Sequence, residues 1–116
     1  MTTEQQRKML ECAAKACGLR HVDYTGIDYD GSDGLVLVNE NGYHTREWNP
    51  RANPADCAEM CAELEIDWLN NWESVVAKQS QEVWVRASIK DHDNSRLKAW
   101  MYAATMCAAK TQGYEE

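Results

Sequence analysis

The segment SRLKAWMYAATMCAAK, residues 95–110, carries the clearest helical pattern in the chain. Its apolar residues recur at intervals of three and four, which places them along one face of an α-helix. These residues are Leu97, Trp100, Met101, Ala104 and Ala108. We expect this helix to begin near Asp93 or Asn94, because acidic residues favour the positive end of the helix dipole. Its apolar face should then pack against a core.

Two further segments predict helices with an apolar face. The first covers residues 3–17, where Thr3 and Gln6 form a capping-box pattern and Gly18 is a typical C-terminal stop. The second opens with Asn53 as its N-cap and Pro54 in its first turn. The apolar residues are Met9, Leu10, Ala13, Ala14 and Cys17 in the first helix, and Cys57, Met60, Cys61 and Leu64 in the second.

The stretches between the helices predict short antiparallel strands. Before the second helix we expect strands at residues 22–24, 35–38 and 43–48, with turns at residues 30–34 and 39–42. The Asn41-Gly42 pair in the second turn is a strong hairpin signal. After the second helix we expect a brief strand at residues 66–68 and a hairpin of residues 72–77 and 82–89.

The last of these strands shows a clear alternation. Val85 and Ala87 face one way, while Trp84 and Arg86 face the other, because strand side chains alternate between the two faces of a sheet. One face of this strand is therefore expected to be apolar and buried.

The resulting order, α-β-β-β-α-β-β(-β)-α, mixes hairpins with helices and indicates an α+β fold. We expect a central, mostly antiparallel sheet with helices packed on both faces, an α/β/α sandwich. A chain of 116 residues corresponds to one domain. This domain should span residues 1–116, with an ordered core at about residues 3–111 and a C-terminal tail that frays.

The charge balance narrows the classes of function. The chain has 12 Lys and Arg against 19 Asp and Glu, a formal net charge of −7. This balance opposes direct binding to nucleic acid, which needs basic side chains, and adhesion to anionic membranes. The apolar runs are too short for a membrane-spanning helix, and the first residues lack the apolar core of a signal peptide. The sequence therefore predicts a cytoplasmic protein without membrane contact.

The sequence contains none of the common catalytic or metal-binding motifs. It has no Gly-x-Ser-x-Gly elbow and no Gly-rich phosphate loop. Cys57 and Cys61 project from one helix face, but a zinc site needs two further ligands. All five cysteines are therefore expected to be reduced and to pack as small apolar side chains. We expect no enzymatic activity, no cofactor and no metal.

The run Asp91-His92-Asp93 has two interpretations. It fits an acid–base pair or a metal clip, and it also fits the start of the last helix, where aspartates cap the chain and complement the dipole. We prefer the capping interpretation because the run directly precedes the strongest helical pattern.

Aromatic residues near arginines provide the candidate binding site. Rings stack and guanidinium groups make bidentate contacts, so such neighbours favour a small anionic or planar ligand, or a protein partner. The alternative is that the five tryptophans fill the core. The candidate residues are Trp48, Asn49, Arg51, Arg46, Trp84 and Arg86.

Acidic residues cluster on and just beyond the second helix, at Glu59, Glu63, Glu65 and Asp67. They form either a solvated surface, which chiefly affects solubility, or a negative patch that imitates nucleic acid. The sequence leaves both alternatives open.

Three segments carry a resemblance to a known family. They are residues 5–19 (QQRKMLECAAKACGL), residues 48–50 (WNP) with residues 53–61 (NPADCAEMC), and residues 95–105 (SRLKAWMYAAT). Through these segments, and over about residues 5–110, the chain resembles the phage ABA sandwich domain family. The Trp-Asn-Pro loop is the most specific of them.

The resemblance implies helices on both faces of a sheet and a small phage accessory protein that acts in the cytoplasm of the infected bacterium. It implies no established catalytic residues. It further implies binding to a host or anti-phage defence protein that is thereby inhibited. The aromatic and arginine residues support an alternative, a sponge that binds a small nucleotide messenger. The sequence leaves the oligomeric state open.

Overall fold

The computed structural model describes residues 3–19, 21–25, 34–38 and 44–115. Its elements are α1 (Thr3–Ala16), β1 (His21–Thr25), β2 (Gly34–Val38), β3 (His44–Trp48), α2 (Pro54–Leu64), β4 (Asp67–Asn70), β5 (Ser74–Lys78), β6 (Trp84–Ser88), the short 3-10 helix η1 (Ile89–His92) and α3 (Arg96–Lys110). The predicted α+β class and element order are confirmed. Of the expected turns at residues 30–34 and 39–42, all but Gly34 lie outside the described residues. Within the described part, no helix has both the length and the apolar character needed to cross a membrane.

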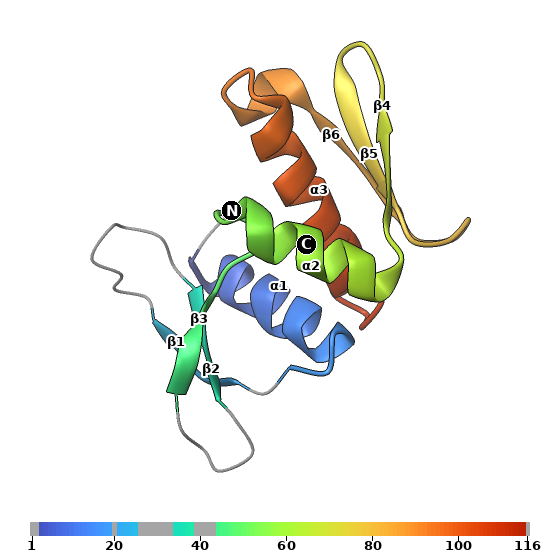
Figure 1. The fold of residues 1–116 in the computed structure, drawn as a ribbon. Coiled ribbons are helices and arrows are strands. Elements are labelled where there is room, and N and C mark those ends of the chain that lie inside the picture. Colours follow the sequence, from blue (N-terminus) through green and yellow to red (C-terminus); the bar gives the residue numbers. More distant parts are fainter. Residues whose placement is uncertain (1–2, 20, 26–33, 39–43, 116) are drawn as a thin grey trace.

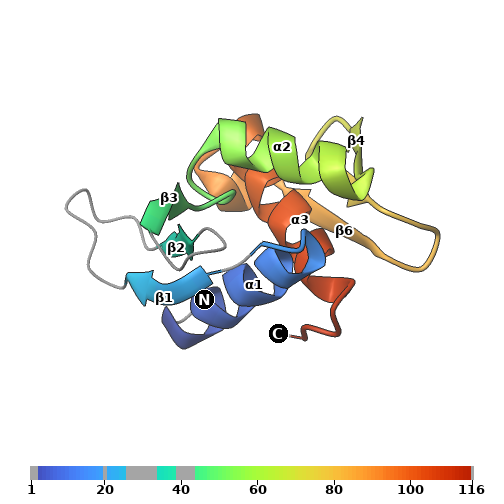
Figure 2. The same ribbon diagram turned by 60° about the horizontal axis from the view of Figure 1, so that its bottom comes forward.

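The six described strands form two three-stranded antiparallel sheets, β1-β2-β3 and β4-β5-β6, where we expected one central sheet. In each sheet a strand pairs with its neighbour in sequence, so each is completed by local hairpins without a long crossover. The α2 helix separates β3 from β4 along the chain. Figures 1 and 2 show the helices between the two sheets, instead of on both faces of one sheet.

The α3 helix is the central element of the core. It contacts β5 and β6 as well as α1 and α2. Most of its buried side chains are small, which lets the neighbouring elements approach closely. These buried residues are Ala99, Met101, Ala103, Ala104, Thr105, Met106, Cys107, Ala108 and Ala109. Burial therefore extends beyond the single predicted stripe, whereas the predicted core residue Leu97 stays 46% exposed.

The predicted C-terminal end of α1 and the predicted start of α2 are confirmed. Gly18 has a φ of +71°, the left-handed conformation that glycine adopts most easily after a helix. Asn53 caps α2, since its Oδ1 accepts hydrogen bonds from the backbone N–H groups of Ala55 at 2.9 Å and Asp56 at 3.3 Å. Pro54 occupies the first helical position. Local signals thus set both boundaries.

The start of α3 differs from the prediction. Ser95 is its N-cap, and the Ser95 Oγ accepts a hydrogen bond from the backbone N–H of Lys98 at 3.2 Å. Asp93 and Asn94 have φ values of 57° and 55°, a left-handed conformation that cannot continue a helix. The Asp93 carboxylate instead pairs with Lys98 Nζ at 2.9 Å. The expectation that Asp91 to Asp93 cap the helix is therefore wrong.

The chain end beyond α3 packs against the domain, contrary to the expected frayed tail. Tyr114 is only 8% exposed. Its hydroxyl donates a hydrogen bond to the backbone carbonyl of Gln5 at 3.1 Å, and its backbone N–H bonds to the carbonyl of Ala109 at 3.3 Å. A large aromatic side chain that reaches α1 stabilises a tail that composition alone marks as loose.

Candidate functional site

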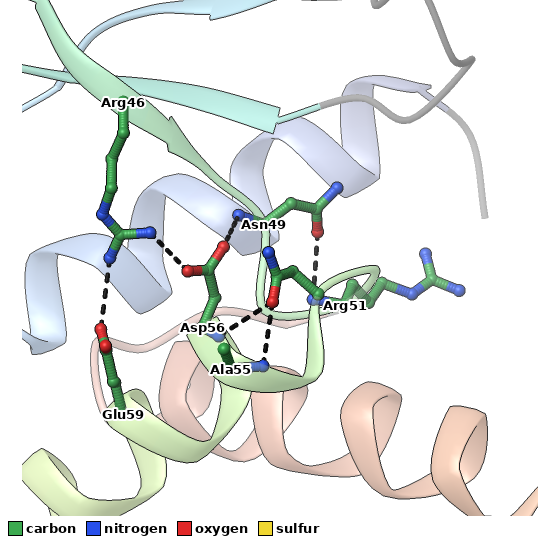
Figure 3. A network of polar contacts seen from close by, with 7 residues as sticks. Arg46, Asn49, Arg51, Ala55, Asp56 and Glu59 are labelled. Carbon is green, nitrogen blue, oxygen red and sulfur yellow. Dashed lines mark hydrogen bonds and ion pairs between the residues drawn. The ribbon is translucent and has the colours of Figure 1, made fainter.

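The loop between β3 and α2 is built around one buried carboxylate, Asp56 (Figure 3). The Asp56 Oδ2 accepts a hydrogen bond from the backbone N–H of Asn49 at 2.9 Å, and Oδ1 accepts one from Nη1 of Arg46. Because the Asp56 side chain is only 4% exposed, its bond with Asn49 forms away from bulk water, where it is stronger. The bond with Arg46 is partly buried. The Trp-Asn-Pro turn is thereby held against the first turn of α2.

Arg46, a candidate binding residue, belongs to this framework. In addition to Asp56, its guanidinium contacts Oε2 of Glu59 through Nη2 at 3.2 Å (Figure 3). Arg46 therefore joins β3 to α2. Two carboxylates already balance its charge, which weakens its attraction for an anionic ligand.

Trp48 and Asn49 are buried. Trp48 is 2% exposed and pairs with Leu35 across β2 and β3. Asn49 is 9% exposed, and its Oδ1 accepts a hydrogen bond from the backbone N–H of Arg51 at 3.0 Å. A small cavity of about 280 Å³ beside Trp48 is also lined by Cys17, Leu19, Arg46, Glu59, Met60 and Glu63. Trp48 fills the core, which is the alternative that the sequence left open for the tryptophans.

A larger cavity brings Arg51 and Arg86 together. Its volume is about 640 Å³, within the usual range for small-molecule sites. Side chains from α1, the β3–α2 loop, β6, η1 and α3 surround it. The lining residues are Gln5, Arg51, Arg86, Ala87, Ser88, Asp91, His92 and Tyr102. Two of the six candidate residues therefore meet in one site, although they are distant in the sequence.

Contacts on two sides hold the Arg51 guanidinium in place. Its Nη1 donates a hydrogen bond to Oε1 of Gln6 at 2.6 Å. Its Cζ lies 5.0 Å from the ring centroid of Tyr102, a cation–π distance. The His92 ring also packs on Tyr102, with centroids 4.7 Å apart. Tyr102 thus positions both a guanidinium and an imidazole at the cavity.

The electrostatics of this cavity differ from those of the acidic chain around it. Burial and the positive charge of Arg51 hold the pKa of His92 below its ordinary value of 6.5, although Asp91 and Asp93 act in the opposite direction. No carboxylate among the described residues forms an ion pair with Arg86. The cavity therefore presents two arginines and a histidine whose pKa is lowered, with Asp91 as its acidic group.

Trp84 lines neither cavity. It is 52% exposed and lies on the outward side of β6. The predicted alternation is confirmed, because Val85 and Ala87 are buried while Trp84 and Arg86 are exposed. Trp84 and Arg86 thus share a strand face but not a cavity.

Sequence reasoning missed the contribution of Tyr102 and placed His92 in a cap or an acid–base pair. Tyr102 falls outside the apolar stripe of α3. A large aromatic residue beside an otherwise small-residue stripe is the signal that could have identified it. No local pattern links Tyr102 to Arg51, because that contact depends on how α3 packs.

The cysteines pack as predicted. All five are free, with Cys57 and Cys107 buried and the others half-buried. Burial raises the pKa of Cys17 and of Cys107 to about 11 in each case. A hydrogen bond between their thiols raises the pKa of Cys57 and lowers that of Cys61. In the described part of the chain, no three His, Cys, Asp or Glu side chains gather closely enough to hold a metal ion.

Comparison with family models, with curated proteins and with solved structures gives no match. The functional proposals below are therefore based on the chemistry of the cavity and of the exposed surfaces.

Proposed function

We propose that the protein is a non-catalytic binding protein that engages a partner protein through its β4-β5-β6 sheet. The observation that carries this proposal is the concentration of exposed apolar side chains. Five large hydrophobic residues in the described part of the chain are exposed, and Leu97 is one of them. The other four belong to this sheet and its first turn: Trp68, Leu69, Trp72 and Trp84. Of these, Trp68 pairs with Ala77 on the covered face and stacks on Trp100 of α3, so Leu69, Trp72 and Trp84 remain for a partner.

The sheet has one covered face and one open face. Val75 and Ala77 are fully buried, on the side where α3 packs. Leu69 pairs with Val76 on the opposite side, because residues directly across an antiparallel ladder share a face. Trp84 also points to that side and is 52% exposed. We call this side, formed by Asp67, Leu69, Val76, Lys78, Trp84 and Arg86, the outer sheet face.

Trp72 extends this surface at the turn between β4 and β5, where it is 90% exposed. The turn is well supported, because Nη1 of Arg96 donates hydrogen bonds to Oδ1 of Asn70 at 2.8 Å and to the carbonyl of Asn71 at 3.0 Å. A tryptophan presented on a supported turn loses little conformational entropy on binding. Tryptophan is also enriched among the residues that dominate interface energies.

The resemblance to phage accessory proteins supports a particular kind of partner. A host or anti-phage defence protein in the bacterial cytoplasm fits that resemblance. The outer sheet face combines apolar side chains with charged ones, as protein interfaces do. Binding alone, by covering a functional surface of the partner, would be sufficient for inhibition.

Site-specific photo-crosslinking tests this proposal. A crosslinking amino acid at position 72 in bacterial cells should capture one defined protein, and the same amino acid at position 7 should not. Arg7 is an exposed residue of α1, and its side chain is 48% exposed. The captured protein is then purified, and its affinity is measured by calorimetry.

We expect Trp72→Ala to weaken that affinity at least about tenfold, as for an interface hot spot, and Arg7→Ala to leave it unchanged. Equal capture at positions 72 and 7, or equal affinities of the two variants, would contradict the assignment of this surface.

A further inference from the structure

The cavity between β6, η1 and α3 differs in chemistry from the exposed Trp72 turn, although the two are neighbours. Ser88, which lines the cavity, pairs with Ser74 just after that turn. We infer that it binds a small phosphorylated ligand that also carries hydroxyl groups, as a nucleoside phosphate or a sugar phosphate does. This inference goes beyond partner binding and does not depend on it.

The two arginines carry the inference. Arg51 and Arg86 both line the cavity, so two guanidinium groups are available to one anion. Arg86 has no carboxylate partner among the described residues. A phosphate group would supply one, and the planar guanidinium matches its oxygen atoms in a bidentate way.

Arg51 is already held in position at the cavity before any anion binds. The contacts with Gln6 and Tyr102 already fix the Arg51 guanidinium. An arginine held in this way loses less side-chain entropy when it binds phosphate. His92 and Ser88 add donors of hydrogen bonds at the same wall.

Asp91 narrows the class of ligand. Its carboxylate repels a purely anionic ligand and accepts hydrogen bonds from hydroxyl groups. A ligand with a phosphate near the arginines and a hydroxyl near Asp91 satisfies both groups. The volume of about 640 Å³ also exceeds what a bare phosphate ion fills.

Calorimetry at constant ionic strength tests the inference with four probes: adenosine monophosphate, ribose 5-phosphate, inorganic phosphate and adenosine. We expect saturable binding of at least one of the two phosphate esters, weaker binding of inorganic phosphate, and none of adenosine. Tighter binding of the nucleotide than of ribose 5-phosphate would identify a nucleotide site, and the reverse order a sugar-phosphate site. Either order supports the inference.

Arg86→Gln is the decisive variant, because Arg86 is exposed and, among the described residues, has no ion pair whose loss would disturb the fold. We expect it to weaken the phosphate ester about tenfold or more, as the loss of a charge-assisted contact does. Arg7→Gln makes the same charge change on α1 and should leave the affinity unaltered. Trp72→Ala should also leave it unaltered, because Trp72 does not line the cavity.

Three results would overturn the inference. They are the absence of saturable binding by either phosphate ester at millimolar concentration, equal affinity of adenosine and its monophosphate, and unchanged affinity in a folded Arg86→Gln protein. Circular dichroism of each variant confirms that it is folded.

Discussion

Asp56 shows how a single buried charge shapes the loop that carries Arg51. A carboxylate removed from water is costly unless hydrogen bonds replace its hydration. Asp56 receives them from Asn49 and from Arg46. It also lies in the first turn of α2, where a negative charge interacts favourably with the helix dipole. The loop conformation therefore depends on this one side chain more than on its exposed neighbours.

We predict that Asp56→Ala lowers the free energy of unfolding by about 1–3 kcal/mol, because the Asn49 N–H loses its acceptor in a buried position. Urea denaturation followed by tryptophan fluorescence measures this change. Glu59→Ala is the matched control, since it removes the second partner of Arg46. Its side chain is 72% exposed, so we expect a loss below about 1 kcal/mol. Equal losses in the two variants would contradict the importance of burial at Asp56.

The α2 helix ends at a residue that is poorly suited to its conformation. Glu65 has a φ of 55° and a ψ of 45°, the left-handed region in which a side chain clashes with its own backbone. This geometry turns the chain from α2 toward β4, and the N–H of Ile66 bonds to the carbonyl of Cys61 at 2.9 Å. Glycine usually occupies this position after a helix.

Glu65→Gly should therefore raise the free energy of unfolding by about 0.5–1 kcal/mol, since relief of backbone strain exceeds the entropy that glycine adds to the unfolded chain. Thermal unfolding monitored by circular dichroism measures the gain. Ala58→Gly introduces the same residue at an exposed position inside α2 and should instead cost about 1 kcal/mol. A loss of stability in Glu65→Gly would show that its side chain makes a contribution larger than the strain.

The whole molecule depends on α3, which joins the β4-β5-β6 sheet to α1 and α2. Tyr114 strengthens this arrangement by linking the segment after α3 to Gln5 in α1. The contact joins residues from opposite ends of the chain. It should therefore contribute to cooperative unfolding of the domain, not only to local order at the C-terminal end.

We predict that Tyr114→Ala lowers the free energy of unfolding by about 3–5 kcal/mol, the usual range for truncating a buried aromatic residue. Tyr114→Phe keeps the ring and removes the hydroxyl, so it should cost only about 1 kcal/mol. Differential scanning calorimetry of both variants separates packing from hydrogen bonding. An unaltered melting temperature in Tyr114→Ala would mean that the tail packs too weakly to matter.

The helices, the hairpins and their order could be predicted because they depend on local spacing. Asn53 and Pro54 start α2, Gly18 ends α1, and the alternation around Trp84 matches the observed strand face. Each of these signals acts within a few residues, through capping hydrogen bonds, backbone freedom or side-chain periodicity. The α+β class followed from the same signals.

The division into two sheets, the burial of Trp48 and the meeting of Arg51 with Arg86 could not be predicted in this way. An apolar residue in a strand looks the same whether its face meets a helix or stays open, so the sequence could not separate buried Trp48 from exposed Trp84. The cavity needs the β3–α2 loop, β6, η1 and α3 to pack together. Such long-range contacts arise from the joint burial of several elements, a property that local spacing does not encode.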